Sequence, residues 1–278
     1  MNNKYSEVVQ TARDYYNSDD AENFYSSIWG GEDIHIGMYN DENEPIFDAS
    51  RRTVEKMISY LKEANQDSRV LDLGSGYGGS ARYLAKKLNC HVDCLNLSEA
   101  QNERNRKMNI DQSLGGFVSV IDGSFEDIPF NEGSFNIAWS QDAILHSGKR
   151  EKVIDETSRV LKKGGEFIFT DIMQSDDCPE GVLQPILDRI HLATLGSPEF
   201  YRETCSSHGM EEITFIDMSE HLPTHYSRVL EEIDNNMEKI CEVCTEEYIT
   251  NMKKGLQHWI DGGKKGYLKW GIFHFTKR

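Results

Sequence analysis

VLDLGSGYGGSAR, residues 70–82, is the stretch of sequence that decides the fold. Its apolar start predicts a strand over 69–73, and SARYLAKKL has the apolar spacing of a helix over 80–88. Glycines stand at 74, 76, 78 and 79 between the two. Glycine is needed where the chain turns tightly and a ligand approaches bare backbone, and its entropic cost disfavours such a cluster elsewhere. The turn therefore predicts a ligand site.

Strand and helix patterns continue to alternate along the chain. Further strands are predicted over 91–95, 117–121, 135–139, 166–170, 211–218 and 268–276. Helices are predicted after Ser98, a good N-cap, and over 149–161. This alternation indicates an α/β fold with a mostly parallel sheet covered on both faces. Helical runs at 226–240 and 245–260 are too long for a hairpin loop, so we expect a cap over the ligand edge.

The predicted organisation is one large domain with additions. Residues 1–66 would form a helical segment that closes over the site, and 67–218 would form the ligand-binding core. Residues 219–266 would form the helical cap, and 267–278 would return as the last strand of the core.

Composition excludes several classes of partner. The chain has 47 acidic and 30 basic residues, and the net charge of −17 disfavours nucleic acid. No signal segment or apolar run of about 18 residues is present, so we expect a cytoplasmic protein without a membrane partner. The six cysteines are expected to be reduced. Cys241 and Cys244 lack a second half-site, so we expect no metal.

The glycine pattern alone leaves the ligand open. Gly74, Gly76 and Gly79 satisfy the dinucleotide pattern G-x-G-x-x-G, which would suit a nicotinamide-dependent oxidoreductase. A dinucleotide-binding turn would give no role to Asp72 or to the additional Gly78. With them, the stretch resembles the first motif of class I S-adenosylmethionine-dependent methyltransferases. The resemblance implies a Rossmann-like sheet of seven strands, S-adenosylmethionine as cofactor and S-adenosylhomocysteine as product.

Two further segments bear on cofactor binding. The second strand ends in Asn96, where an acidic residue is usual, and an amide can also bond a ribose diol. Residues 122–130, DGSFEDIPF, resemble the methyltransferase loop beside the adenine. The alternatives are an ordinary polar helix start and a loop anchored in the core by Pro129 and Phe130. The resemblance implies these cofactor-binding residues: Tyr25, Ile36, Gly37, Asp72, Gly74, Gly76, Asn96, Leu97, Gln101, Ser124, Phe125 and Ser140.

The fourth strand leads into candidate catalytic residues. Residues 138–147 read AWSQDAILHS, which sets Asp142 and His146 four apart, on one face if a helical turn follows. The carboxyl edge of an α/β sheet is where ligands bind, and a carboxylate can orient an imidazole and raise its basicity. A satisfied core histidine is the alternative. We predict that His146 and Asp142, with Tyr16, orient the acceptor and take its proton when it has one.

A narrower resemblance covers nearly the whole chain. WSQDAILH (139–146) and the aromatic-rich FYSSIWGGEDIHIGMY (24–39) are similar to segments of the sarcosine/dimethylglycine N-methyltransferases. The resemblance implies methylation of dimethylglycine, and of sarcosine, to glycine betaine. Aromatic faces attract such cations, although any single aromatic residue is as readily a core residue. The candidate substrate-binding residues are Trp29, Tyr39, Trp139, Gln141, Tyr201, Arg202 and Tyr226.

Several alternatives stay open. The acceptor carboxylate needs a cation, and Arg51, Arg52, Arg202 and Arg228 are equal candidates. Phosphoethanolamine or a natural-product hydroxyl is the alternative acceptor, although residues 176–267 hold 18 acidic and only 8 basic side chains, a poor phosphate site. A binding protein without turnover is a third reading. The predicted partner is a small-molecule amine, and the chain is expected to be a monomer or homodimer.

Overall fold

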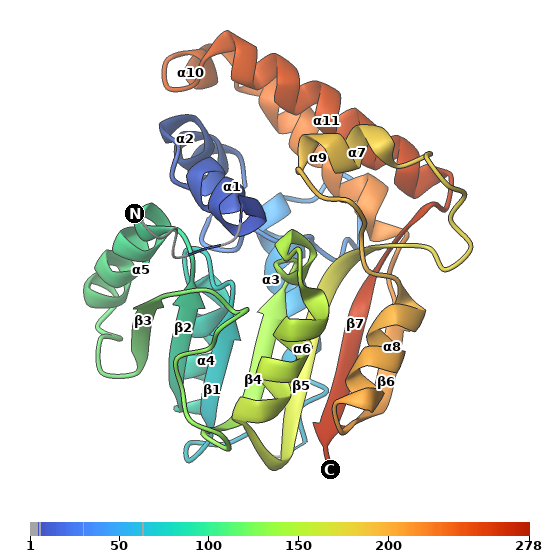
Figure 1. Ribbon diagram of the computed structural model, residues 1–278. Helices are drawn as coiled ribbons and strands as arrows, with labels where there is room; N and C mark the ends of the chain where they lie inside the picture. The colour runs from blue at the N-terminus through green and yellow to red at the C-terminus, as the bar shows by residue number, and fades with distance from the viewer. Residues whose placement is uncertain (1–4, 6, 30, 63) are drawn as a thin grey trace.

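The computed structural model describes residues 5, 7–29, 31–62 and 64–278. One sheet of seven strands runs through it in the order β3-β2-β1-β4-β5-β7-β6. Strands β1 to β5 pair in parallel, and β7 lies antiparallel between β5 and β6 (Figure 1). The strands are β1 (Arg69–Leu73), β2 (His91–Asn96), β3 (Val118–Asp122), β4 (Phe135–Gln141), β5 (Leu161–Gln174), β6 (Met210–Asp217) and β7 (Leu268–Lys277). The predicted Rossmann-like sheet is confirmed.

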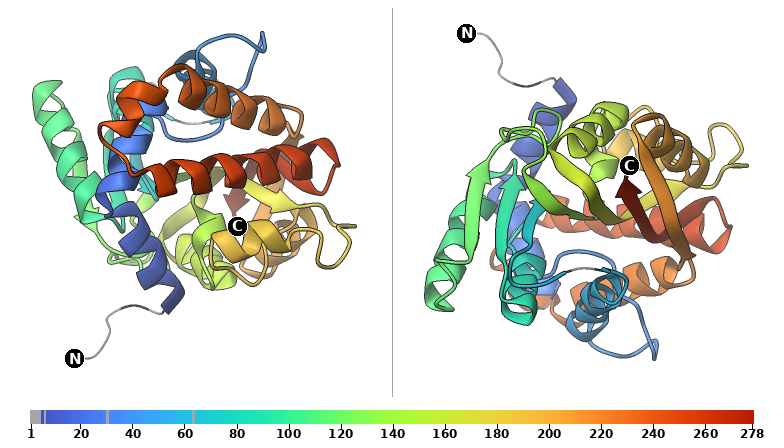
Figure 2. Two further views of the ribbon diagram at one scale, coloured as in Figure 1. Left: turned by 90° about the horizontal axis from the view of Figure 1, so that it is seen from above. Right: turned by 90° about the horizontal axis from the view of Figure 1, so that it is seen from below.

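Helices cover both faces of the sheet, because alternate residues of each central strand point to opposite sides. On β1, Val70 packs into the cluster that holds Ala81, whereas Leu71 packs into the cluster that holds Val153. Helices α3 (Ile46–Ile58), α4 (Gly79–Leu88) and α5 (Glu99–Asp111) lie on the first face, and α6 (Arg150–Val160) and α8 (Pro198–Ser207) lie on the second (Figure 2).

The remaining helices gather over the carboxyl ends of the parallel strands (Figure 1). Asp20 joins the N-terminal helices to the cap, because its carboxylate accepts bonds from the N–H and hydroxyl of Thr245, both at 2.9 Å. Arg13 and Asn17 join them to the core through the carboxylate of Glu99. These helices are α1 (Glu7–Tyr16), α2 (Asp19–Ile28), α7 (Gln184–Arg189), α9 (His221–Asn235), α10 (Met237–Cys241) and α11 (Glu246–Lys264).

Two features differ from the sequence prediction. Strand β5 begins at Leu161, which pairs with Phe135, so residues 161–165, which lie between the predicted helix end and the predicted strand over 166–170, belong to the strand. Helices α7 and α8 were not predicted, and α7, with six residues, is too short for its periodicity to appear.

Within the described ranges, no helix is both long and apolar enough to cross a membrane.

Candidate active site

The turn after β1 depends on glycine. Gly74 has φ +74° and Gly76 has φ +51°, which are left-handed conformations that favour glycine. A Cβ on Gly74 would lie 2.4 Å from the Cβ of Ala143, closer than real side chains approach. The turn after β1 and the loop after β4 therefore meet with no room for a side chain between them, and together they border a cavity at the carboxyl edge of the sheet.

This glycine-loop cavity, of about 100 Å³, collects most of the predicted cofactor-binding residues. Its wall also includes Gln141, Asp142 and His146, so the loop after β4 reaches the same space. Gln141, predicted to bind the acceptor, lies here. The predicted residues on its wall are Gly74, Gly76, Asn96, Leu97, Gln101, Ser124 and Phe125.

A small polar pocket of about 30 Å³ extends from the glycine turn past Asp72. Several of its lining atoms are buried and have no hydrogen-bond partner in the described part of the chain, among them Asp72 Oδ2, Ser75 Oγ and Gln141 Nε2. Burial raises the pKa of Asp72 to about 7. The unpaired oxygen of Asp72 and the unpaired amide N–H of Gln141 would be satisfied by a ligand with an ammonium and a carboxylate, as on the amino-acid end of S-adenosylmethionine.

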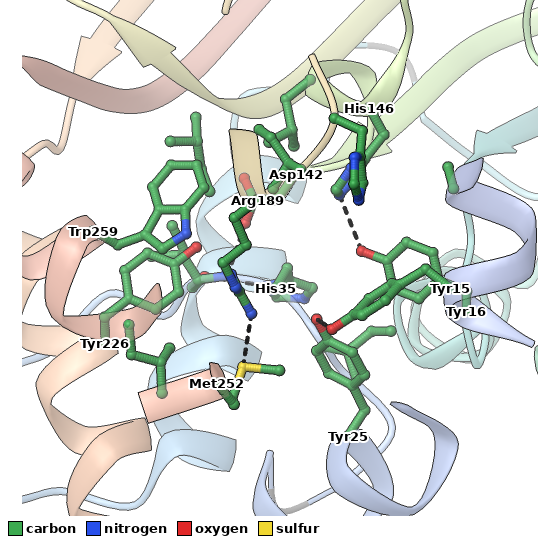
Figure 3. Close-up of a pocket in the computed structure, with 18 of the residues that line it drawn as sticks. Tyr15, Tyr16, Tyr25, His35, Asp142, His146, Arg189, Tyr226, Met252 and Trp259 are labelled. Carbon is green, nitrogen blue, oxygen red and sulfur yellow. Dashed lines mark hydrogen bonds between the residues drawn. The ribbon is translucent and has the colours of Figure 1, made fainter. Parts of the chain in front are cut away.

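A second cavity, of about 330 Å³, lies between the sheet edge and the covering helices. We call it the aromatic cavity, because tyrosine and tryptophan side chains from α1, α2, α9 and α11 form much of its wall (Figure 3). It shares Ala12, Tyr16, Ile34, Asp142 and His146 with the glycine-loop cavity. These five residues form the junction between the two spaces. The aromatic residues are Tyr15, Tyr16, Tyr25, Trp29, Tyr226, Tyr248 and Trp259.

At the junction, Tyr16 and His146 are bonded to each other. The hydroxyl of Tyr16 lies 3.0 Å from Nε2 of His146, which ends the short turn η1 (Ile144–His146) (Figure 3). Burial, with the positive charges of Arg150 and Arg189, lowers the pKa of His146 to about 4. Burial also raises the pKa of Tyr16 well above its usual value. At neutral pH the pair therefore consists of a neutral imidazole and a protonated phenol.

Asp142 lies at the junction but does not act on His146 as predicted. Its Oδ2 accepts the backbone N–H of Ile36 at 2.7 Å, and its Oδ1 accepts the indole N–H of Trp270 at 2.8 Å. No hydrogen bond between Asp142 and His146 is present in the described chain. The reason is local: Asp142 has φ +49°, so the helical turn assumed by the four-residue spacing does not begin there. Asp142 instead holds the loop containing Ile36 against the core.

The other predicted residues divide into two groups. Tyr25, Trp29, Ile36 and Tyr226 line the aromatic cavity. The second group lines none of the three spaces and is engaged elsewhere. Gly37 packs on Ala49, and the hydroxyl of Ser140 donates a hydrogen bond to the carbonyl of Leu73. The hydroxyl of Tyr39 is hydrogen-bonded to His225, and the fully buried Trp139 donates its indole N–H to Gln141. The hydroxyl of Tyr201 donates to Asp171, and exposed Arg202 forms an ion pair with Glu212.

Sequence analysis missed the wall contributed by the cap. Tyr248, Met252 and Trp259 lie four and seven residues apart on α11 and face the cavity together, a spacing visible in the sequence. Arg189, at the end of α7, also lines the cavity, and the short helix that carries it left no signal.

The four arginines proposed for the acceptor carboxylate lie elsewhere. None of them lines the aromatic cavity as the structure describes it. All are paired with acidic residues: Arg51 with Asp33, Arg52 with Glu44, Arg202 with Glu212, and Arg228 with Glu231 and Glu232. Nor do the described residues include a group of three or more histidine, cysteine or acidic side chains placed to hold a metal.

Comparison with known proteins agrees with this geometry. A methyltransferase-domain family matches residues 71–169. The chain is 59% identical to a sarcosine/dimethylglycine N-methyltransferase of Halorhodospira halochloris, over 98% of this chain and 97% of that one. A protein of the same name from Aphanothece halophytica is 53% identical, over 97% and 98% of the two chains. A Galdieria sulphuraria crystal structure with a sarcosine dimethylglycine methyltransferase name is 41% identical, with a TM-score of 0.91 over 95% and 98%. Identity at this level over nearly the full length shows that the chain belongs to the sarcosine/dimethylglycine N-methyltransferase family.

Proposed function

We propose that the protein transfers a methyl group from S-adenosylmethionine to the nitrogen of dimethylglycine, and of sarcosine, to form glycine betaine. The observation that carries this proposal is the junction, where a glycine-lined cavity opens beside an aromatic one at Tyr16, Asp142 and His146. The names of the relatives support the choice of acceptor.

The cofactor would occupy the glycine-loop cavity and the polar pocket beside it. Gly74 and Gly76 would allow close approach to the backbone, and Asn96 and Gln101 would bond the ribose. The unpaired Asp72 Oδ2 and Gln141 Nε2 would receive the amino-acid end. S-adenosylmethionine supplies a methyl group on a positively charged sulfur. We also propose that residues 1–66 and the insertion 219–266 close over the bound ligands, which the Asp20–Thr245 link supports.

The aromatic cavity would hold the acceptor amine. In the transfer, the nitrogen lone pair forms the new C–N bond while the C–S bond breaks and its electron pair stays on sulfur. The product nitrogen is then positively charged. Tyrosine and tryptophan faces attract such a charge, and the enclosing walls exclude water, so positioning would supply most of the acceleration.

His146 would assist by holding and accepting a proton. Its imidazole is neutral at working pH, because burial lowers its pKa to about 4. A secondary amine such as sarcosine has a proton to lose after methylation, whereas a tertiary amine in its uncharged form has none. The bond to Tyr16 would keep the imidazole turned to the junction.

Turnover tests the proposal. Purified protein is incubated with S-adenosylmethionine and, separately, glycine, sarcosine, dimethylglycine or phosphoethanolamine, and S-adenosylhomocysteine and the methylated amine are followed by mass spectrometry. Betaine from dimethylglycine is expected, and turnover of sarcosine would set the breadth of the activity. Cofactor binding without any product would contradict the assigned acceptor. Thermal stabilisation by NAD and none by S-adenosylhomocysteine would contradict the cofactor.

A further inference from the structure

Arg189 brings an uncompensated positive charge into the aromatic cavity. Among the described residues that line this cavity it is the single arginine or lysine, and it forms no ion pair within the described chain. Its Nη2 is bonded to the sulfur of Met252 at 3.0 Å, a weak acceptor that leaves the charge unneutralised. Figure 3 shows the guanidinium reaching in between Tyr226 and Trp259 on one side and Tyr15, Tyr16 and Tyr25 on the other.

Helix α11 makes room for this side chain. Gly255 lies within the helix, where glycine is about 1 kcal/mol less favourable than alanine. A Cβ at this position would lie 2.3 Å from Nε of Arg189 and 2.6 Å from its Cζ. The glycine therefore costs helix stability at the place where the guanidinium passes across the helix. Met252, one turn earlier, bonds the same guanidinium, so α11 both admits and orients Arg189.

The acidic and the basic side chain of the aromatic cavity lie at opposite sides of it. Asp142 is the one carboxylate among its described lining residues, and it lies at the junction with the glycine-loop cavity. Arg189 lines the aromatic cavity but not the glycine-loop cavity. The carboxyl group of Asp142 thus lies at the junction, and the guanidinium of Arg189 lies on the side toward α7 and α11. A small molecule with a cationic nitrogen and an anionic group would align with its nitrogen toward the junction.

We propose that Arg189 binds the carboxylate of the acceptor and thereby points the acceptor nitrogen at the junction. This inference rests on the proposed function and assigns its specificity to amines that carry a carboxylate. A guanidinium forms two parallel bonds with a carboxylate, which orients the ligand as well as holding it. In this arrangement the acceptor neutralises a charge that the protein itself leaves unpaired.

Substitution of Arg189 tests the inference. In Arg189→Met we expect the KM for dimethylglycine to rise on the order of 100-fold, because a charged partner is lost, with S-adenosylhomocysteine affinity unchanged. The KM of Arg189→Lys should lie between those of the wild type and Arg189→Met, since an ammonium keeps the charge but lacks the planar two-bond geometry. Lys253→Met is the matched control: it removes one positive charge from α11 outside the cavity, where Lys253 pairs with Asp234. An unchanged KM in Arg189→Met would overturn the inference.

Comparing acceptors with and without a carboxylate distinguishes a binding role of Arg189 from a purely structural one. Dimethylethanolamine replaces the carboxylate by a hydroxymethyl group, so its kcat/KM should be low in the wild type and nearly unaffected by Arg189→Met. Gly255→Ala should raise the KM for dimethylglycine without lowering the thermal midpoint, because it displaces the guanidinium while improving the helix. Equal losses on both acceptors would indicate a packing role and contradict the inference.

Binding measurements keep the two proposals distinguishable. Calorimetric titration of dimethylglycine into the protein saturated with S-adenosylhomocysteine needs no turnover. If the wild type binds dimethylglycine, Arg189→Met does not, and no methyl transfer is seen, the proposed reaction fails while the role of Arg189 stands. If the wild type turns over dimethylglycine and Arg189→Met binds it equally well, only the role of Arg189 fails. Absence of binding to the wild type would overturn both.

Discussion

Burial sets the chemical state of the single residues that matter most at the junction. His146 is kept neutral by burial and by two nearby arginines, whereas Tyr16 is kept protonated. A polar pair in these states can hold an amine without carrying a charge that would repel a cationic product. Asp142 is the carboxyl group at the junction; burial raises its pKa, and its two bonds to Ile36 and Trp270 fix its position.

The first prediction concerns His146. In His146→Asn we expect kcat for sarcosine to fall on the order of 100-fold, and kcat for dimethylglycine to fall less, because only sarcosine has a proton to lose after transfer. Initial rates with both acceptors at saturating S-adenosylmethionine provide the measurement. His208→Asn, which changes a histidine outside both cavities, should behave as the wild type. Equal losses on the two acceptors would argue for positioning alone.

A second residue-scale prediction concerns pH and stability. Nδ1 of His225 faces the N–H of Gly37 at 3.3 Å and the hydroxyl of Tyr39 at 2.9 Å. Burial, with the nearby charge of His35, lowers its pKa from 6.5 to about 3. Between these values the unfolded chain binds the extra proton, so the free energy of unfolding falls as pH falls from 6.5 toward 3.

His225→Gln removes this proton uptake. The pH dependence of the unfolding free energy below pH ~6.5 should become shallower by up to about 1.4 kcal/mol per pH unit. Urea unfolding followed by circular dichroism at a series of pH values gives the slope. If both proteins show the same slope, the histidine is not buried in its neutral form.

Sequence reasoning worked for residues whose position follows from the backbone. Gly74, Asn96 and Phe125 stand at the carboxyl ends of strands or just after them, and that edge is shared by the whole sheet. Trp139 and Tyr201 were assigned to the acceptor, but each packs inward, because side-chain direction in a strand or helix depends on register with neighbours. Arg189 was invisible, since only tertiary packing brings it to the cavity.

At the scale of elements, the turn from β1 to α4 is the most constrained part of the chain. Its positive φ angles and the 2.4 Å approach to Ala143 leave no space for a side chain at Gly74. Gly133, in the loop before β4, also has a positive φ of 64° but faces open space. Substitution of Gly133 therefore introduces backbone strain alone, whereas substitution of Gly74 introduces backbone strain and a steric clash.

The third prediction uses this pair. Both Gly74→Ala and Gly133→Ala should lower stability by about 1 kcal/mol or more, the cost of a left-handed non-glycine residue. Only Gly74→Ala should abolish binding of S-adenosylhomocysteine, because it also pushes the loop after β4 into the glycine-loop cavity. Calorimetric titration and thermal unfolding on both variants decide the matter. Undiminished affinity in Gly74→Ala would contradict the assignment of the cofactor to this cavity.

A helix or strand could be predicted where its own residues show an apolar pattern, and it was missed where distant residues determine it. The buried strands of the sheet carry continuous apolar runs, and all seven, five paired in parallel and β6 and β7 paired antiparallel, were expected at or near their observed places. Strand β5 begins earlier than expected because Leu161 is paired by Phe135, a partner distant in sequence. Helices α7 and α8 follow from packing against α11 and β6, which local periodicity does not report.

At the scale of the whole molecule, the aromatic cavity is enclosed by parts of the chain that are far apart in sequence. Helices α1 and α2 lie between core and cap. Phe24 and Ile28 of α2 belong to the same buried apolar cluster as Tyr226 and Ile249 of the cap. Polar bonds add to this packing, from Arg13 to Glu99 of the core and from Asp20 to Thr245 of the cap. The closure proposed above would require these links to open for a ligand to enter.

The fourth prediction follows from that arrangement. With S-adenosylhomocysteine and glycine betaine near 100 times their Kd, amide exchange in α1, α2 and the first half of α11 should slow by up to about 100-fold, because the ligands bind only the closed form. Hydrogen–deuterium exchange with mass spectrometry measures this. Exchange in α8, on the far face of the sheet, serves as the internal control (Figure 2). Uniform slowing would indicate global stabilisation instead of local closure.

The position of β7 has a consequence for synthesis. Strand β7 (Leu268–Lys277) fills the slot between β5 and β6, so the sheet has a gap until residues 268–277 have been made. A nascent chain that still lacks β7 exposes the edges of β5 and β6, which can pair with other chains. Addition of β7 closes that gap, and a chain truncated before residue 268 would be an aggregation-prone product, not a slightly weakened enzyme.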